Sequence, residues 1–156
     1  MDAKMRGIVR VVPYDPEWKN EFLKIKAMIV DCVGDLIISV DHVGSTAIEG
    51  LASKPILSKI GFEYVENLDV EGKEVFKRIF TDDFMPYNLY VCPKNGKGYL
   101  EHIAFRDYLR NHSEVMKTYE ELKLELAKQF RTDINGYANA KHDFIQNILD
   151  SLSKIN

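Results

Sequence analysis

Apolar residues in the last third of the chain recur at the spacing of α-helices, and this pattern constrains the fold more than any other feature. The apolar positions between residues 113 and 130 are Val115, Tyr119, Leu122, Leu126 and Phe130. Their spacing of three or four places them on one helix face. We predict helices over 99–111 and 113–130, and a final helix with the face Tyr137, Phe144, Ile148 and Leu152. Ser113 is expected to cap the second helix, and Asp133 or Asn135 the final one.

A helix is also predicted near the start of the chain. Residues 15–17, Asp-Pro-Glu, combine a capping acid, a proline suited to the first helical position and an acid for the first turn. Apolar residues then follow at spacings of four, three and four: Trp18, Phe22, Ile25 and Ile29. Gly34 is suited to end this helix. Before it, residues 9–12 are predicted to form a short strand or an extended arm.

Strands are predicted in the middle of the chain. Segments rich in β-branched and aromatic residues cover 36–43, 61–65, 75–80 and 87–92. The first of them ends at a Gly-Ser-Thr turn, and the last is followed by the turn-forming pair Asn95-Gly96. Strands in the middle with helices on both sides of them in sequence indicate the α+β class.

Length and charge narrow the range of functions. A chain of 156 residues is enough for a single domain, residues 1–156, with one continuous core. Its net charge of −3 argues against nucleic acid or an anionic membrane surface as the main partner. Residues 1–10 lack the apolar core of a signal peptide, and no apolar run approaches the ~20 residues of a membrane span. Cys32 and Cys92 show no metal-ligand spacing and are expected to be reduced, buried side chains. We therefore expect a cytoplasmic protein.

The segment from Asp41 to Ile56 is the strongest candidate for a functional site. A predicted strand stops at Gly44-Ser45-Thr46, and a short helix-like segment follows. Hydroxyls and unpaired backbone N–H groups at the start of a helix attract phosphate. Lys54 can add a positive charge. The alternative is a tight corner with a helix cap, and the spacing does not decide between the two. The turn lacks the lysine of a Walker phosphate loop and is no Gly-x-Gly-x-x-Gly fingerprint.

Two further groups of polar residues are candidates with structural alternatives. His42 precedes the turn at a predicted strand end, but a single histidine is more often a structural hydrogen-bonding group. The other histidines show no metal-ligand spacing, so we expect no zinc site. Arg106 and Arg110 share a helix face and can bind an anion or pair with nearby acids. Asp107 can hold one of these arginines or orient a histidine. A surface lattice of salt bridges explains the same residues equally well.

Taken together, two segments resemble a known family. The first is His42–Ala47 through Gly50-Leu51, with Lys54-Pro55-Ile56. The second is His102 with residues 105–110, Phe-Arg-Asp-Tyr-Leu-Arg, and His112. These segments resemble the two signatures of the GrpB family of bacterial proteins. The resemblance extends from Val9 to about Leu149.

This resemblance implies a fold and a class of ligand. GrpB proteins are similar to the nucleotidyltransferase superfamily, whose fold is a small mixed β-sheet flanked by helices; here the C-terminal third is also expected to be helical. In that superfamily a Gly-Ser turn holds a nucleoside triphosphate, and a following acidic strand binds two Mg²⁺ ions for in-line transfer. The resemblance therefore implies a nucleotide or phosphate ligand, and Mg²⁺ as a cofactor whose ligands in this chain are unknown.

Roles for individual residues also follow from the resemblance. The phosphate-binding residues it implies are Gly44, Ser45, Thr46 and Arg106. The catalytic residues would be His42, which orients a substrate or the turn, and Lys54, which neutralises developing charge. His102 and Asp107 would support them. The function implied is Mg²⁺-dependent nucleotidyl or phosphoryl transfer to an unidentified small acceptor. The alternative is a non-catalytic module that senses a nucleotide or a coenzyme-like phosphate, and the oligomeric state is left open.

The sequence departs from the family pattern directly after Ile56. The family continues there with an acidic strand and a helix, but here residues 57–64 follow almost at once. About 20 residues are absent, the size of a strand with its crossover helix, and they include the expected metal carboxylates. Either the segment has been deleted, or it exists in the protein and is absent from this sequence. The second explanation is favoured, because loss of an inner strand leaves backbone groups unpaired.

Overall fold

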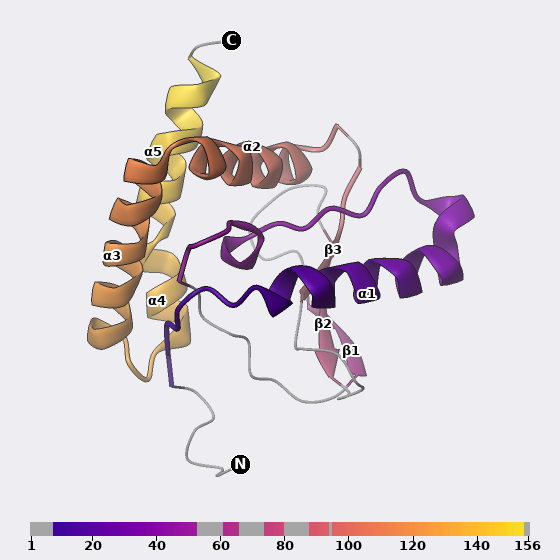
Figure 1. The fold of residues 1–156 in the computed structure, drawn as a ribbon, viewed down its shortest axis with the longest axis horizontal. Helices are drawn as coiled ribbons and strands as arrows, with labels where there is room; N and C mark the ends of the chain where they lie inside the picture. Colours follow the sequence, from indigo (N-terminus) through magenta and orange to yellow (C-terminus); the bar gives the residue numbers. More distant parts are fainter. Residues whose placement is uncertain (1–7, 53–60, 66–73, 80–87, 94, 155–156) are drawn as a thin grey trace.

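The computed structural model describes residues 8–52, 61–65, 74–79, 88–93 and 95–154 (Figure 1). The α-helices are α1 (Glu17–Val33), α2 (Lys97–Asn111), α3 (Ser113–Gln129), α4 (Ile134–Ala140) and α5 (His142–Ser153). The 3₁₀ turns are η2 (Gly34–Leu36) and η3 (Ser45–Ala47), and the strands are β1 (Gly61–Val65), β2 (Glu74–Ile79) and β3 (Asn88–Val91). In the described part of the chain, no helix is long and apolar enough to cross a membrane.

The C-terminal third is helical, as predicted, and its helices pack around α3. In Figure 1, the end of α2 meets the upper end of α3 and lies against α5, which continues past α2 to the C-terminus. The final predicted helix is two helices, because the chain turns at Lys141 between α4 and α5. Asp133 caps α4 by accepting a hydrogen bond from the Gly136 N–H at 2.8 Å, which confirms one of the two predicted caps.

The prediction that Ser113 caps the second of these helices is wrong. Ser113 is the first residue of α3, and His112 takes the cap position. A single residue separates α2 from α3, so His112 is both the C-cap of α2 and the N-cap of α3. Its N–H donates to Leu109 O at 3.4 Å, and its carbonyl accepts from Met116 N at 2.9 Å.

α1 begins and ends where the sequence predicts. The Asp15 carboxylate accepts a hydrogen bond from the Glu17 N–H at 2.9 Å, and Gly34 follows the last helical residue. Trp18 and Ile25 on the predicted face are buried. Cys32, in the last turn of α1, is exposed, so the expectation of a buried thiol is wrong there.

The strand predicted over residues 36–43 is not present. η2 includes Leu36, and the chain then continues without regular structure to η3, with Ile38 76% exposed. A strand is stabilised by a backbone ladder and by a sheet face that buries alternate residues. None of the described strands pairs with this segment, which passes between α1 and α2 instead (Figure 1).

β1, β2 and β3 lie close to the ranges predicted for them. β1 pairs antiparallel with β2, with Gly61 opposite Ile79. β2 pairs antiparallel with β3, with Phe76 opposite Leu89. Only antiparallel pairs occur among the described strands, whereas the nucleotidyltransferase-like fold implied by the resemblance has a mixed sheet. That finer assignment stays a prediction.

Two groups of buried residues hold the helices and loops together. The first joins the segment after η3 to α2 and α3, and consists of Ile48, Leu51, Leu109 and Tyr119. The second joins the N-terminal arm to α3 and α4, and consists of Val9, Leu126 and Tyr137. Fully burying one large apolar side chain stabilises a fold by roughly 1.5–3 kcal/mol. The first group fixes the Gly44–Thr46 turn against the helical third.

Candidate functional site

The Gly44–Thr46 turn is built on one unusual backbone conformation. Gly44 has φ 80° and ψ −177°, where an L side chain is strained. One 3₁₀ turn follows, with hydrogen bonds from Ala47 N to Gly44 O at 3.1 Å and from Ile48 N to Ser45 O at 3.2 Å. An α-helix does not start here, so the helix-dipole argument for phosphate binding loses most of its force. Within the described residues, the N–H groups of Ser45 and Thr46 donate to no other group.

Two arginines of α2 fix the two ends of the turn. The Arg106 guanidinium donates from Nη1 to His42 O at 3.1 Å. The Arg110 guanidinium donates from Nε and Nη2 to Ala47 O, at 3.1 and 2.7 Å. Arg106 and Arg110 are one helical turn apart, so a single face of α2 reaches both carbonyls. The predicted phosphate clamp, Arg106, therefore lies at the turn but is already engaged with the backbone.

Asp107 lies between the two arginines. Its Oδ1 accepts a hydrogen bond from Arg106 Nε at 2.7 Å and is 3.7 Å from Arg110 Nη1. The hydrogen bond from Arg106 is the main reason why the pKa of Asp107 is lowered from its ordinary value. The prediction that Asp107 holds an arginine is confirmed. One carboxylate opposes two guanidinium groups here, so the local charge is positive.

His42 supports the turn from its N-terminal side. Its Nε2 is 3.0 Å from Thr46 Oγ1, and its ring stacks on Phe22 with centroids 4.7 Å apart. Burial, followed by the charges of Arg110 and Arg106, lowers the pKa of His42 to about 4. The imidazole is therefore neutral at pH 7 and cannot act as a proton donor through an imidazolium. Its contacts suit the predicted role of orienting the turn.

Sequence reasoning missed the most unusual residue of the site, Lys123 of α3. A lysine on a helix is ordinarily exposed, but Lys123 is 1% exposed, and its Nζ donates to Ala52 O. The same amine lies 4.9 Å from the centroid of the Tyr119 ring. Burial, with the charge of Lys141 as the next cause, lowers the pKa of Lys123 to about 7, while Glu120 opposes the shift. Its spacing in the sequence could have indicated this burial, because position 123 falls on the same apolar face of the helix as Tyr119 and Leu126.

Residues of α3 connect Lys123 to the turn. Burial raises the pKa of Tyr119 above its ordinary value, and the Ser45 side chain acts in the opposite direction. Glu120 accepts a hydrogen bond from the Ala52 N–H at 3.0 Å, so α3 binds both backbone groups of Ala52. The segment from Ala47 to Ala52 is thus held at both ends by helical side chains, because Arg110 of α2 binds Ala47 O and α3 binds Ala52.

Other predicted site residues are not brought to the turn or cannot be placed. His102 lies one helical turn before Arg106 and stacks on Tyr90 of β3, with centroids 5.1 Å apart. Lys54 lies outside the described residues.

The described residues do not fit the implied Mg²⁺ site. Among them, no group of three or more His, Cys, Asp or Glu side chains could hold a metal ion. Two of the carboxylates near the turn already have partners: Asp107 binds Arg106, and Glu120 binds the Ala52 N–H. We therefore derive no step through a metal.

Comparison with known proteins gives the family. A family model described as GrpB protein matches residues 8–58 and 56–151. The chain belongs to the GrpB family. The two matched segments meet at residues 56–58, where the sequence departs from the family pattern.

Relatives and a solved structure agree with this assignment. The chain is 32% identical to the glutamate-rich protein GrpB of Alkalihalophilus pseudofirmus, over 94% of this chain and 97% of that protein. It is 29% identical to a UPF0157 protein of Streptomyces coelicolor, over 85% of this chain and 77% of that protein. The crystal structure of conserved protein GrpB from Enterococcus faecalis superposes with a TM-score of 0.79 at 26% identity, over 94% of this chain and 99% of that one.

The first of these alignments also bears on the interruption after Ile56. It runs over 170 positions but takes in 94% of the 156 residues, so some residues of the relative have no counterpart in this chain. This agrees with the absence of a segment inferred from the family pattern.

Proposed function

We propose that this GrpB-family protein binds a small phosphate-bearing molecule, a nucleotide or a coenzyme-like phosphate, at the Gly44–Thr46 turn. The observation that carries the proposal is the positive charge of α2 directed at this turn. Arg106 and Arg110 both lower the pKa of His42, and Asp107 is the one carboxylate bound to them among the described residues. An anion at the turn would be attracted by the same field.

The turn itself supplies hydrogen-bond donors for such an anion. The N–H groups of Ser45 and Thr46 lie beside each other in a backbone that the arginines hold in place. Consecutive N–H groups in a fixed turn form an anion-binding concavity. Because Arg106 and Arg110 are already bonded to backbone carbonyls, they contribute charge and rigidity, and the turn contributes the direct contacts.

A non-catalytic binding module is the form of this function that the described residues favour. They contain no carboxylate cluster for Mg²⁺, and His42 is a neutral positioning group. Nucleotidyl or phosphoryl transfer remains the second hypothesis, and it requires carboxylates from outside the described residues. The two differ in metal dependence: the module binds without Mg²⁺ and does not convert its ligand.

The direct experiment is calorimetric titration of the protein with ATP, with and without Mg²⁺, in two matched variants. Ser45→Pro removes the N–H donor, and proline suits both the 3₁₀ φ and the extended ψ of Gly44 before it. Ser45→Ala removes the hydroxyl and keeps the N–H. We expect binding to be lost in Ser45→Pro and largely kept in Ser45→Ala.

Thermal unfolding and product analysis complete this experiment. At a free ATP concentration ten times its Kd, binding would stabilise the native protein by about 1.4 kcal/mol. ATP that does not raise the unfolding temperature of the wild type, with or without Mg²⁺, would contradict nucleotide binding. Release of pyrophosphate or inorganic phosphate that requires Mg²⁺ would instead establish the transfer hypothesis.

A further inference from the structure

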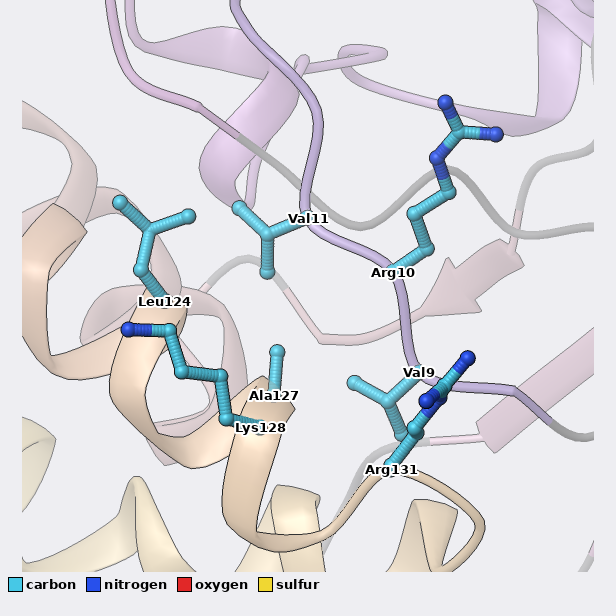
Figure 2. Close-up of a pocket in the computed structure, with 7 residues that line it drawn as sticks. All are labelled: Val9, Arg10, Val11, Leu124, Ala127, Lys128 and Arg131. Atoms are coloured by element: carbon cyan, nitrogen blue, oxygen red, sulfur yellow. The ribbon is translucent and has the colours of Figure 1, made fainter.

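A groove separate from the turn lies between the N-terminal arm and the second half of α3. Its volume is about 390 Å³, and Figure 2 shows its lining. The apolar part of the lining is Val9, Val11, Leu124 and Ala127. Leu124 is 42% exposed.

The arm is held in an extended conformation that sets the direction of its side chains. Val9 is buried, and its N–H donates to Arg131 O at 2.8 Å. Side chains alternate along an extended chain, so Val9 and Val11 turn to one side and Arg10 to the other. Figure 2 shows both valines on the side of α3 and the Arg10 guanidinium directed away from Leu124.

Two cations, Lys128 and Arg131, border this apolar floor, and the third cation of the lining, Arg10, is directed away from it. Lys128 is 3.7 Å from Glu125, but both side chains are more than two-thirds exposed, so this ion pair is weak. In Figure 2 the Lys128 amine lies beside Leu124, and the Arg131 guanidinium lies beside Val9. The groove is thus a basic site on a chain whose net charge is −3.

We propose that this groove docks an acidic peptide segment of a partner protein, with one apolar side chain on the floor and carboxylates on both sides of it. The charge complementarity selects an acidic occupant. The apolar floor between the cations selects a chain that alternates apolar and charged side chains, as an extended peptide does. A nucleic acid would leave this apolar floor without an apolar partner.

The probe is a fluorescein-labelled acidic heptapeptide with one central leucine, EDELEDE, followed by fluorescence anisotropy. Its control is the same peptide with serine in place of leucine. We expect the leucine peptide to bind more tightly, and its affinity to fall as salt is raised because the contacts are exposed charges. Equal affinity of the two peptides, or no binding, would overturn the proposal.

Matched variants separate the floor from the cations. Replacing both Lys128 and Arg131 by Glu is expected to weaken binding at least about tenfold, whereas Lys117→Glu, an exposed change on the same helix, leaves it unchanged. Leu124→Ala leaves every charge in place and is expected to abolish the preference for leucine over serine. This second variant keeps the test decisive if the double charge reversal fails to fold.

Two other occupants give distinct results. Stronger binding to vesicles of phosphatidylcholine with one-quarter phosphatidylglycerol than to the peptide, lost in the Lys128 and Arg131 variant, would replace the peptide by a membrane surface. Self-association in sedimentation velocity, lost in Leu124→Ala, would replace it by a second copy of the chain. Either result would overturn the proposal.

Discussion

Lys123 makes a specific prediction about how stability depends on pH. The pKa of this lysine falls from 10.5 to about 7 on folding, because the amine is buried. Between these two values the unfolded chain binds more protons than the native one, so stability rises with pH. The contribution of Lys123 to the free energy of unfolding therefore reaches its highest value above pH 10.5, and this gain is lost as pH falls to about 7. At 1.36 kcal/mol per pKa unit, the whole range corresponds to a few kcal/mol, on the order of 4–5.

Substitution by methionine removes this dependence. Lys123→Met keeps the length and the apolar stem, and removes the charge together with the hydrogen bond to Ala52 O. Loss of that donor costs about 1–3 kcal/mol at every pH, because the carbonyl is left unpaired. From pH 7 to 9.5, the free energy of unfolding of the wild type should therefore increase relative to that of Lys123→Met.

Urea unfolding at half-unit intervals from pH 6.5 to 9.5 measures the difference between the two proteins. This range stays below the raised pKa values of Tyr119 and Tyr137, which act with the opposite sign at higher pH. The control is Lys117→Met, at an exposed position of the same helix, which should give a difference that does not vary with pH. If the wild type and Lys123→Met differ by a constant amount over the range, Lys123 is solvated and the reasoning is refuted.

Three further predictions concern the turn. Gly44→Ala should lower the free energy of unfolding by about 1–2 kcal/mol, because φ at Gly44 is 80°. The control Gly34→Ala, at φ −54°, should lower it less. Equal losses for the two variants in urea titrations would contradict the strain assigned to Gly44. Arg110→Ala removes two hydrogen bonds to Ala47 O and should cost about 1–3 kcal/mol, with partial recovery in Arg110→Lys; an unchanged urea midpoint would argue against this anchor. His42 should titrate near pH 4 in NMR spectra, and its preference for the neutral form should reduce stability as pH falls from 6.5 to 4; a midpoint near 6.5 would show that the ring is solvated.

The periodicity of the sequence predicted the helices well because each buried face is a local pattern. The faces of α1 and α3, and the Asp133 cap, all depend on residues within a few positions of one another. The division between α4 and α5 was missed, because the apolar face continues across Lys141 without a glycine or proline to mark the break. The strand over 36–43 was wrong because a strand also needs a partner, and pairing is not written in the local sequence.

The site was predicted in position but not in detail. The Gly44–Thr46 turn and the arginines of α2 were identified as candidates, and the structure brings them together. It also shows what spacing could not show: the guanidinium groups bind backbone carbonyls 63 and 64 positions away. Lys123 was not identified as a site residue, because lysines are seldom buried and its burial depends on the distant Ala52 carbonyl.

The measurement that tests the central claim most directly is a titration of the ¹⁵N-labelled protein with inorganic pyrophosphate, followed through its amide resonances. The account predicts saturable shifts of the Ser45 and Thr46 amides, without added Mg²⁺, and their loss at residue 46 in Ser45→Pro. Amides in the C-terminal half of α5, such as Asp150 and Leu152, serve as an internal control and should not move. Resonances of Ser45 and Thr46 that stay in place while the protein is saturated elsewhere, or through the whole titration, would contradict the claim that this turn binds phosphate.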